Sequence, residues 1–257
     1  MKYGCFLGVM FLGLLSAEAQ TPGAEGGITE GPDYIQVRQR WANNCSDVSI
    51  SPGMSKVEVD VALEVAKNPT QYRNQRILVC WRLALATCAF AGDRRCFLSL
   101  KNLFTMSKEK RSKLRPLTYR GIIGRAPGLI ATYAYFSKDL EAESFLLDAT
   151  HKAWWYRQEW IYEPEIRGRL SLEDLVAIST ESVVSALSFT GMSASRRFLS
   201  QRVEKYRDTK PWVSLQAQEF LVRADRVVKY GLLKVFEFER EQYRNGCKSQ
   251  SSTPKER

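Results

Sequence analysis

A stretch of aromatic and acidic residues between positions 154 and 165 carries side chains suited to chemistry on a sugar. Glu159 and Glu163 stand four residues apart, so a helix would place both carboxylates on one face. Glycoside hydrolysis needs one carboxyl group as a proton donor and usually a second one as a base or nucleophile. The aromatic residues that would form a neighbouring sugar-stacking surface are Trp154, Trp155, Tyr156 and Trp160. The stretch therefore has two functional interpretations. The first is a binding surface, and the second is the active site of a carbohydrate-active enzyme that works on an envelope polymer.

A structural role accounts for the same stretch without any ligand. In that interpretation the tryptophans pack one helical unit onto the next, while Glu159 and Glu163 pair with Arg157 and Arg167. Pro164 follows the acidic pair directly and would end a helix that carries it. We prefer the structural interpretation and keep the binding surface and the catalytic pair as alternatives.

A basic segment lies upstream, between positions 108 and 116, in a chain whose net charge is +10. Against one acidic residue, Glu109, its cations are Lys108, Lys110, Arg111, Lys113 and Arg115. Clustered positive charge attracts polyanions, so an acidic glycan or an anionic membrane surface is a candidate ligand. Nucleic acid is not expected, because the aromatic residues that stack on single strands are missing here. We prefer a structural interpretation, an exposed loop between two helix pairs, and keep the ligand-binding surface as the alternative.

Chemistry based on histidine, metal ions or cofactors is not expected. His151 is the only histidine of the chain, and we interpret it as a structural residue at a helix end. Phosphate-loop, dinucleotide-binding, nucleophile-elbow and zinc-protease motifs are all absent from the sequence. We therefore predict no metal, no cofactor and no firm candidate for catalysis.

The N-terminus predicts export to a periplasm or to the extracellular space. Residues 1–19 combine Lys2, an apolar run over positions 5–15 and the small-residue pattern Ala17-Glu18-Ala19, as signal peptides do. The apolar run is shorter than the ~20 residues of a membrane span, although a retained anchor stays an alternative.

Removal of this signal would leave five cysteines, an odd number that does not favour a disulfide framework. A bridge between Cys88 and Cys96 is geometrically feasible across a turn at Gly92-Asp93. We prefer Cys80 and Cys88 as small buried apolar residues. A bridge from Cys45 to Cys247 is disfavoured, since it would bring the two ends of the mature chain together.

The rest of the chain predicts an all-α fold. We divide it into a flexible leader with a short helix near 34–43 (residues 20–54), a helical domain (55–245) and a disordered tail (246–257). Capping and proline signals start helices at Ser55, Asn68-Pro69, Ser171 and Lys210-Pro211. The helix after Lys210 is predicted to be the longest, running to about position 243 and ending at Asn245-Gly246. Its apolar stripe consists of Val213, Ala217, Phe220, Leu221, Ala224, Val227, Val228, Gly231, Val235 and Phe238.

A weak self-similarity runs through the helical domain. A small-residue motif, a polar or glycine turn and a Phe-Leu doublet recur in that order. The copies are 86–90 with 97–98, 131–135 with 145–146, and 185–187 with 198–199. The pattern resembles the HEAT and armadillo-like helical repeats, with tetratricopeptide repeats as the nearest rival and a non-repetitive bundle as the alternative. The resemblance implies a stack of helical hairpins that binds a protein partner. We therefore expect an exported scaffold, with a glycan enzyme or a membrane-docking module as alternatives.

Overall fold

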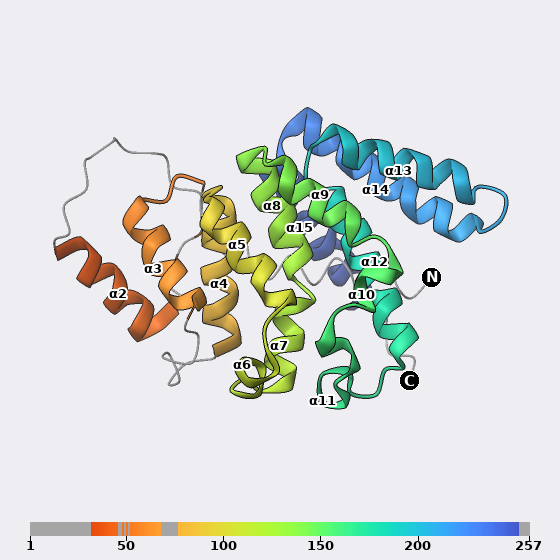
Figure 1. Cartoon of the computed structure of the whole chain (residues 1–257). Coiled ribbons are helices and arrows are strands. Elements are labelled where there is room, and N and C mark those ends of the chain that lie inside the picture. The colour runs from red at the N-terminus through yellow and green to blue at the C-terminus, as the bar shows by residue number, and fades with distance from the viewer. Residues whose placement is uncertain (1–31, 46–47, 49, 51, 68–76, 252–257) are drawn as a thin grey trace, which may run out of the picture.

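Every regular element of the described chain is a helix (Figure 1). The computed structural model describes residues 32–45, 48, 50, 52–67 and 77–251. The predicted signal at 1–19 and the predicted helix start at Asn68-Pro69 lie outside these residues. The helices, in chain order, are α2 (Pro32–Asn44), α3 (Lys56–Lys67), α4 (Ile77–Phe90), α5 (Arg94–Phe104), α6 (Lys108–Ser112), α7 (Pro116–Ile123), α8 (Ala126–Ser137), α9 (Leu140–Asp148), α10 (Lys152–Trp155), the 3-10 turn η3 (Glu159–Tyr162), α11 (Pro164–Arg167), α12 (Leu172–Leu187), α13 (Ser193–Tyr206), α14 (Pro211–Tyr230) and α15 (Leu232–Ser251). The predicted all-α class is confirmed.

The three self-similar segments form three helical hairpins, α4–α5, α8–α9 and α12–α13. Each connecting turn contains one residue in the left-handed region, namely Gly92 (φ 64°), Lys138 (φ 56°) and Gly191 (φ 62°). This conformation ends a helix by turning the chain away from its axis, and glycine adopts it without strain. The turns that the sequence indicated are therefore the places where the chain reverses direction.

Aspartates fix the start of the second helix in two of these hairpins. Asp93 accepts a hydrogen bond from the amide of Arg95 (2.8 Å), and Asp139 accepts from the amides of Glu141 (2.8 Å) and Ala142 (3.4 Å). Burial alone would raise the pKa of the Asp139 carboxyl, but these amides, the Tyr133 hydroxyl (2.8 Å) and the charge of Arg94 outweigh it and lower that pKa. The ionised carboxylate is thus part of the folded turn.

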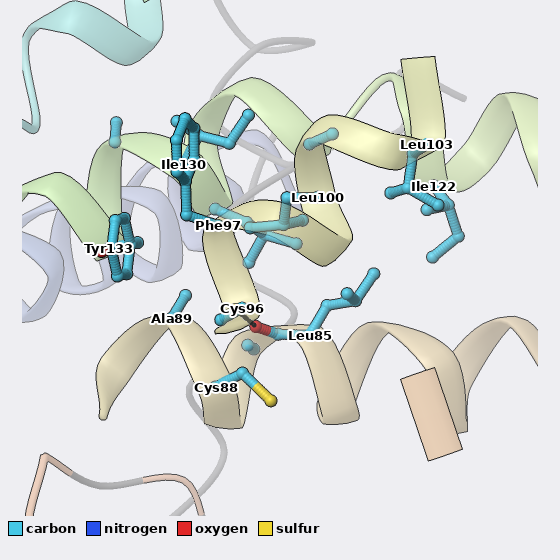
Figure 2. Packing of buried hydrophobic residues seen from close by; sticks show 14 of the residues in the cluster. Leu85, Cys88, Ala89, Cys96, Phe97, Leu100, Leu103, Ile122, Ile130 and Tyr133 are labelled. Carbon is cyan, nitrogen blue, oxygen red and sulfur yellow. Dashed lines mark hydrogen bonds between the residues drawn. The ribbon is translucent and has the colours of Figure 1, made fainter. Parts of the chain in front are cut away.

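The hairpins pack in chain order, because α4 contacts α8 and α8 contacts α12. Alanines allow the close approach, and Ala86, Ala89, Ala131 and Ala134 are all fully buried. Figure 2 shows the α5 side chains Phe97 and Leu100 in the same buried cluster as residues of α4 and α8, and Phe97 stacks on Tyr133 with ring centroids 5.6 Å apart. The small-residue motif therefore serves helix packing.

The predicted single helix from Lys210 to about position 243 is wrong. Gly231 has φ 84° and ψ 154°, which breaks the segment into α14 and α15. Helix α15 turns back so that Phe236 lies against Phe189 and Phe90, with ring centroids 5.3 and 6.4 Å apart. It also continues to Ser251, past the Asn245-Gly246 pair that was expected to end it. Helix α15 thus packs against the turns of two separate hairpins, α4–α5 and α12–α13.

The helix predicted near 34–43 is confirmed as α2, which packs on α3 and buries Trp41. A disulfide joins Cys45 to Cys80 on α4, so Cys80 is not the free apolar residue that was expected. Cys88 and Cys96 are buried free thiols. The described part of the predicted leader is therefore attached covalently to the helical domain.

Candidate functional site

The basic segment is an exposed connection that begins as the short helix α6 (Lys108–Ser112) and continues through a turn at 113–115 to the start of α7, so only its second half is the loop that was expected. The hydroxyl of Ser107 caps its start by accepting from the amide of Lys110 (3.5 Å). Four of the five predicted cations, Lys108, Lys110, Lys113 and Arg115, are exposed. The fifth, Arg111, is only 4% exposed and points into the protein. The predicted basic surface therefore excludes Arg111.

The Arg111 guanidinium joins the basic segment to the aromatic stretch, 52 residues later. Its Nε donates to Oε1 of Glu163 at 3.0 Å, and its Nη2 bonds to the same oxygen. Its Nη1 donates to the carbonyl of Met106. Glu159 lies further out, with its Oε2 3.8 Å from Nη2 and its side chain 82% exposed. The expected partners Arg157 and Arg167 are thus replaced by one arginine from a distant helix.

This arrangement does not suit general acid catalysis by the two glutamates. A proton donor must be able to reach a substrate oxygen, whereas Oε1 of Glu163 already accepts two hydrogen bonds from the Arg111 guanidinium. Glu159 and Glu163 also do not share a helix, since Glu159 opens η3 and Glu163 precedes α11. Glu163 instead neutralises a buried charge, which is a structural task.

The tryptophans of this stretch lie mainly in the core. Trp155 and Trp160 are each 1% exposed, and the Trp155 indole donates to the carbonyl of Ala149 at 2.8 Å. Trp160 packs edge-on against Tyr119 of α7, with ring centroids 6.0 Å apart. Half-buried Trp154 packs against Phe104 of α5 (5.3 Å). The predicted binding surface therefore excludes Trp155 and Trp160, whose rings are covered by protein.

Among the four aromatic residues of the predicted binding surface, Tyr156 is the one that is exposed. Tyr156 is 37% exposed, and its carbonyl accepts a hydrogen bond from the Tyr162 hydroxyl at 2.9 Å. His151 occupies the exposed cap position before α10, at a helix end as predicted. Within the described ranges, no three His, Cys, Asp or Glu side chains are grouped so that they could hold a metal ion.

An apolar surface that the sequence did not predict lies on α14. Trp212 and Leu215 are each 67% exposed, and Val222 is 42% exposed. The opposite side of α14 carries most of the predicted stripe, with Val213, Ala217, Phe220, Ala224 and Val227 buried. Val228, which was also predicted on this stripe, is instead 55% exposed. A signal was present in the sequence, because Trp212 and Leu215 do not fit the spacing of the buried stripe.

Figure 1 shows α13 and α14 as an antiparallel pair that extends beyond the other helices. None of the helices in the described ranges combines the length and the apolar character that a bilayer span requires. No family model, curated protein or solved structure matches the chain. The proposals below therefore rest on the residues and their geometry.

Proposed function

We propose that the protein is an exported, non-catalytic helical-repeat scaffold that binds a protein partner through the outer face of α14. The observation that carries the proposal is the exposed apolar face formed by Trp212, Leu215 and Val222. Exposed tryptophan is uncommon on a surface that stays in water, and tryptophan is enriched among the residues that dominate binding energy.

The spacing of this face favours a helix as the partner element. At 100° per residue, Trp212, Leu215 and Val222 fall within an arc of about 80° on α14. Exposed Glu219 and Arg226 complete the stripe in steps of three and four residues, which is the spacing of helix-pairing seams. We infer that the partner presents an amphipathic helix with apolar residues opposite Trp212 and Leu215.

Two observations support export. Residues 1–19 have the composition of a signal peptide, and the Cys45–Cys80 disulfide is a bond that persists mainly in oxidising compartments. The stacked hairpins support a scaffold, because such stacks hold an exposed helix face in a fixed orientation.

A photo-crosslinking amino acid at position 215 tests the partner surface in the native envelope or secreted fraction. The matched control is position 140, where Leu140 is 73% exposed on the separate helix α9. We expect one protein to crosslink from position 215 and none from position 140. Equal crosslinking from both positions, or recovery of glycan fragments alone, would contradict the proposal.

The purified partner then gives a quantitative test. Truncation of a tryptophan at the centre of an interface weakens binding by about 2 kcal/mol, which is roughly thirtyfold in Kd. We expect Trp212→Ala to weaken the complex to this extent in titration calorimetry and Leu140→Ala to leave the Kd unchanged. A Kd that Trp212→Ala does not change would refute the α14 surface.

A membrane surface or an acidic glycan is the second candidate ligand, and the four exposed cations around α6 favour it. Leu117 lies beside them at the start of α7 and is 74% exposed. Anionic vesicles should then sediment with the wild-type protein at low salt and less with Lys110→Gln/Arg115→Gln. Binding that stays undiminished at high salt would exclude this electrostatic mode, because salt screens exposed charges.

A further inference from the structure

Two arginines whose charges interact lie on elements that pack together, namely α4 and the junction of α7 and α8. Arg82 lies on α4, and Arg125 occupies the cap position between α7 and α8. Both side chains are partly buried, and the Nε atom of each is fully buried without a hydrogen-bond partner. Ser182 of α12 reaches the same turn, because its hydroxyl donates to the carbonyl of Gly124 at 3.3 Å.

Three other buried or partly buried arginines of this protein have a carboxylate beside them. Arg111 pairs with Glu163, Arg202 with Glu181 and Arg223 with Glu239. Among the described residues, no carboxylate lies within ion-pair distance of Arg82 or Arg125. The polar contact that the structure does provide is from Nη1 of Arg125 to the carbonyl of Gly121 at 2.7 Å.

The two charges are unfavourable where they stand. Burial lowers the pKa of the Arg82 guanidinium, and the neighbouring charge of Arg125 lowers it further. Burial likewise lowers the pKa of Arg125. Two like charges with buried, unsatisfied donors are stabilised when an anion binds between them.

We propose that Arg82 and Arg125 form a binding site for a phosphate-type oxyanion. A guanidinium presents N–H donors in a planar fork that matches the oxygens of such an anion, and two guanidinium groups match a double negative charge. The positive end of the α8 dipole adds to the potential at Arg125. The ligand is either free phosphate or the phosphomonoester group of a larger molecule. This site is independent of the α14 surface, so either proposal can fail alone.

Thermal unfolding and titration calorimetry with inorganic phosphate test the site, with sodium chloride of equal ionic strength as the reference. We expect phosphate to raise the Tm of the full chain to a saturating limit and to bind with one-to-one stoichiometry. Arg82→Gln and Arg125→Gln should each weaken phosphate binding by roughly tenfold or more, because each removes one charged fork. Arg169→Gln, which changes an exposed arginine, should bind like the wild type.

Two further measurements on Arg82 variants distinguish a specific phosphate site from a general effect of positive charge. Without phosphate, Arg82→Gln should fold and be at least as stable as the wild type, because it removes one of two repelling charges. Arg82→Lys keeps the positive charge but lacks the planar set of N–H donors of the guanidinium, so it should bind phosphate more weakly than the wild type. Circular dichroism verifies that each variant is folded.

The two ligand sources give different results with glycerol phosphate. Tighter binding of this phosphomonoester than of inorganic phosphate assigns the site to a larger ligand, and weaker binding assigns it to the free ion. The proposal is overturned if phosphate acts no differently from chloride, or if the two glutamine variants keep the wild-type phosphate affinity.

Discussion

Replacing Glu163 with glutamine removes the negative charge that faces the buried guanidinium of Arg111. The amide keeps the size of the side chain but leaves Arg111, whose side chain is 3% exposed, with the carbonyl of Met106 and the distant, exposed Glu159. Removing one partner of a buried ion pair destabilises a protein by about 3–5 kcal/mol. The Glu163 side chain is 20% exposed, so we expect the lower end of this range, about 3 kcal/mol.

Urea unfolding measures this change directly, since a loss of stability lowers the midpoint and leaves the slope m unchanged. For a chain of this size, about 3 kcal/mol corresponds to a fall in Tm of roughly 6–12 °C. The matched control is Glu159→Gln, which removes a carboxylate from the same neighbourhood but from an 82% exposed position. We expect that control to change the free energy of unfolding by less than about 0.5 kcal/mol.

A double substitution tests whether the isolated charge is the cause. Arg111→Met/Glu163→Leu removes both charges, so it should be less destabilising than Glu163→Gln alone. Equal stabilities of Glu163→Gln and Glu159→Gln would refute the reasoning, because Arg111 would then not depend on Glu163.

Three further predictions concern the fold. Cys45→Ser/Cys80→Ser opens a loop of 35 residues and should lower the free energy of unfolding by about 3–4 kcal/mol, measured in urea under non-reducing conditions. The lowered pKa of Asp139 stabilises the fold above the ordinary carboxyl pKa of about 4, and this contribution is lost as the pH falls through the lowered value. Asp139→Asn should therefore weaken the dependence of Tm on pH below about 4, and an unchanged profile would contradict this. Gly231→Ala should cost about 1–3 kcal/mol, because φ is 84° there and the new methyl group would also lie 3.4 Å from the Tyr135 hydroxyl. Gly53→Ala, which meets no atom within 4 Å, is its control and should change the thermal unfolding curve little.

The limits of sequence-based prediction are clearest at Gly231 and Cys80. The apolar spacing continues from Val227 to Val235, so Gly231 looked like one more member of a helical stripe. Its positive φ accompanies the packing of α15 on aromatic residues of α4 and of the turn after α12, far away in the sequence. Cys80 has the local sequence of a buried apolar residue, and only the position of α2 brings Cys45 to it.

The candidate sites likewise combine features that the sequence indicated with features that depend on tertiary packing. The clustering of cations at α6 was visible in the sequence, but the inward direction of Arg111 depends on Glu163, which lies 52 residues away. The tryptophans were recognised as a group, whereas the burial of Trp155 and Trp160 depends on helices α5 and α7. Neither Arg82 nor Arg125 belongs to a motif, and the packing of α4 on α7 and α8 is what brings their charges into the same region.

The sequence by itself determined the helical class and the places of the three hairpin turns. Helix periodicity, aspartate caps and turn glycines act through contacts between residues a few positions apart, so their signals are local. The tertiary structure alone decided which arginine is buried, which cysteines pair and which aromatic side chains stay exposed. These outcomes depend on the burial and charge of side chains brought together from distant segments, and no local pattern specifies them.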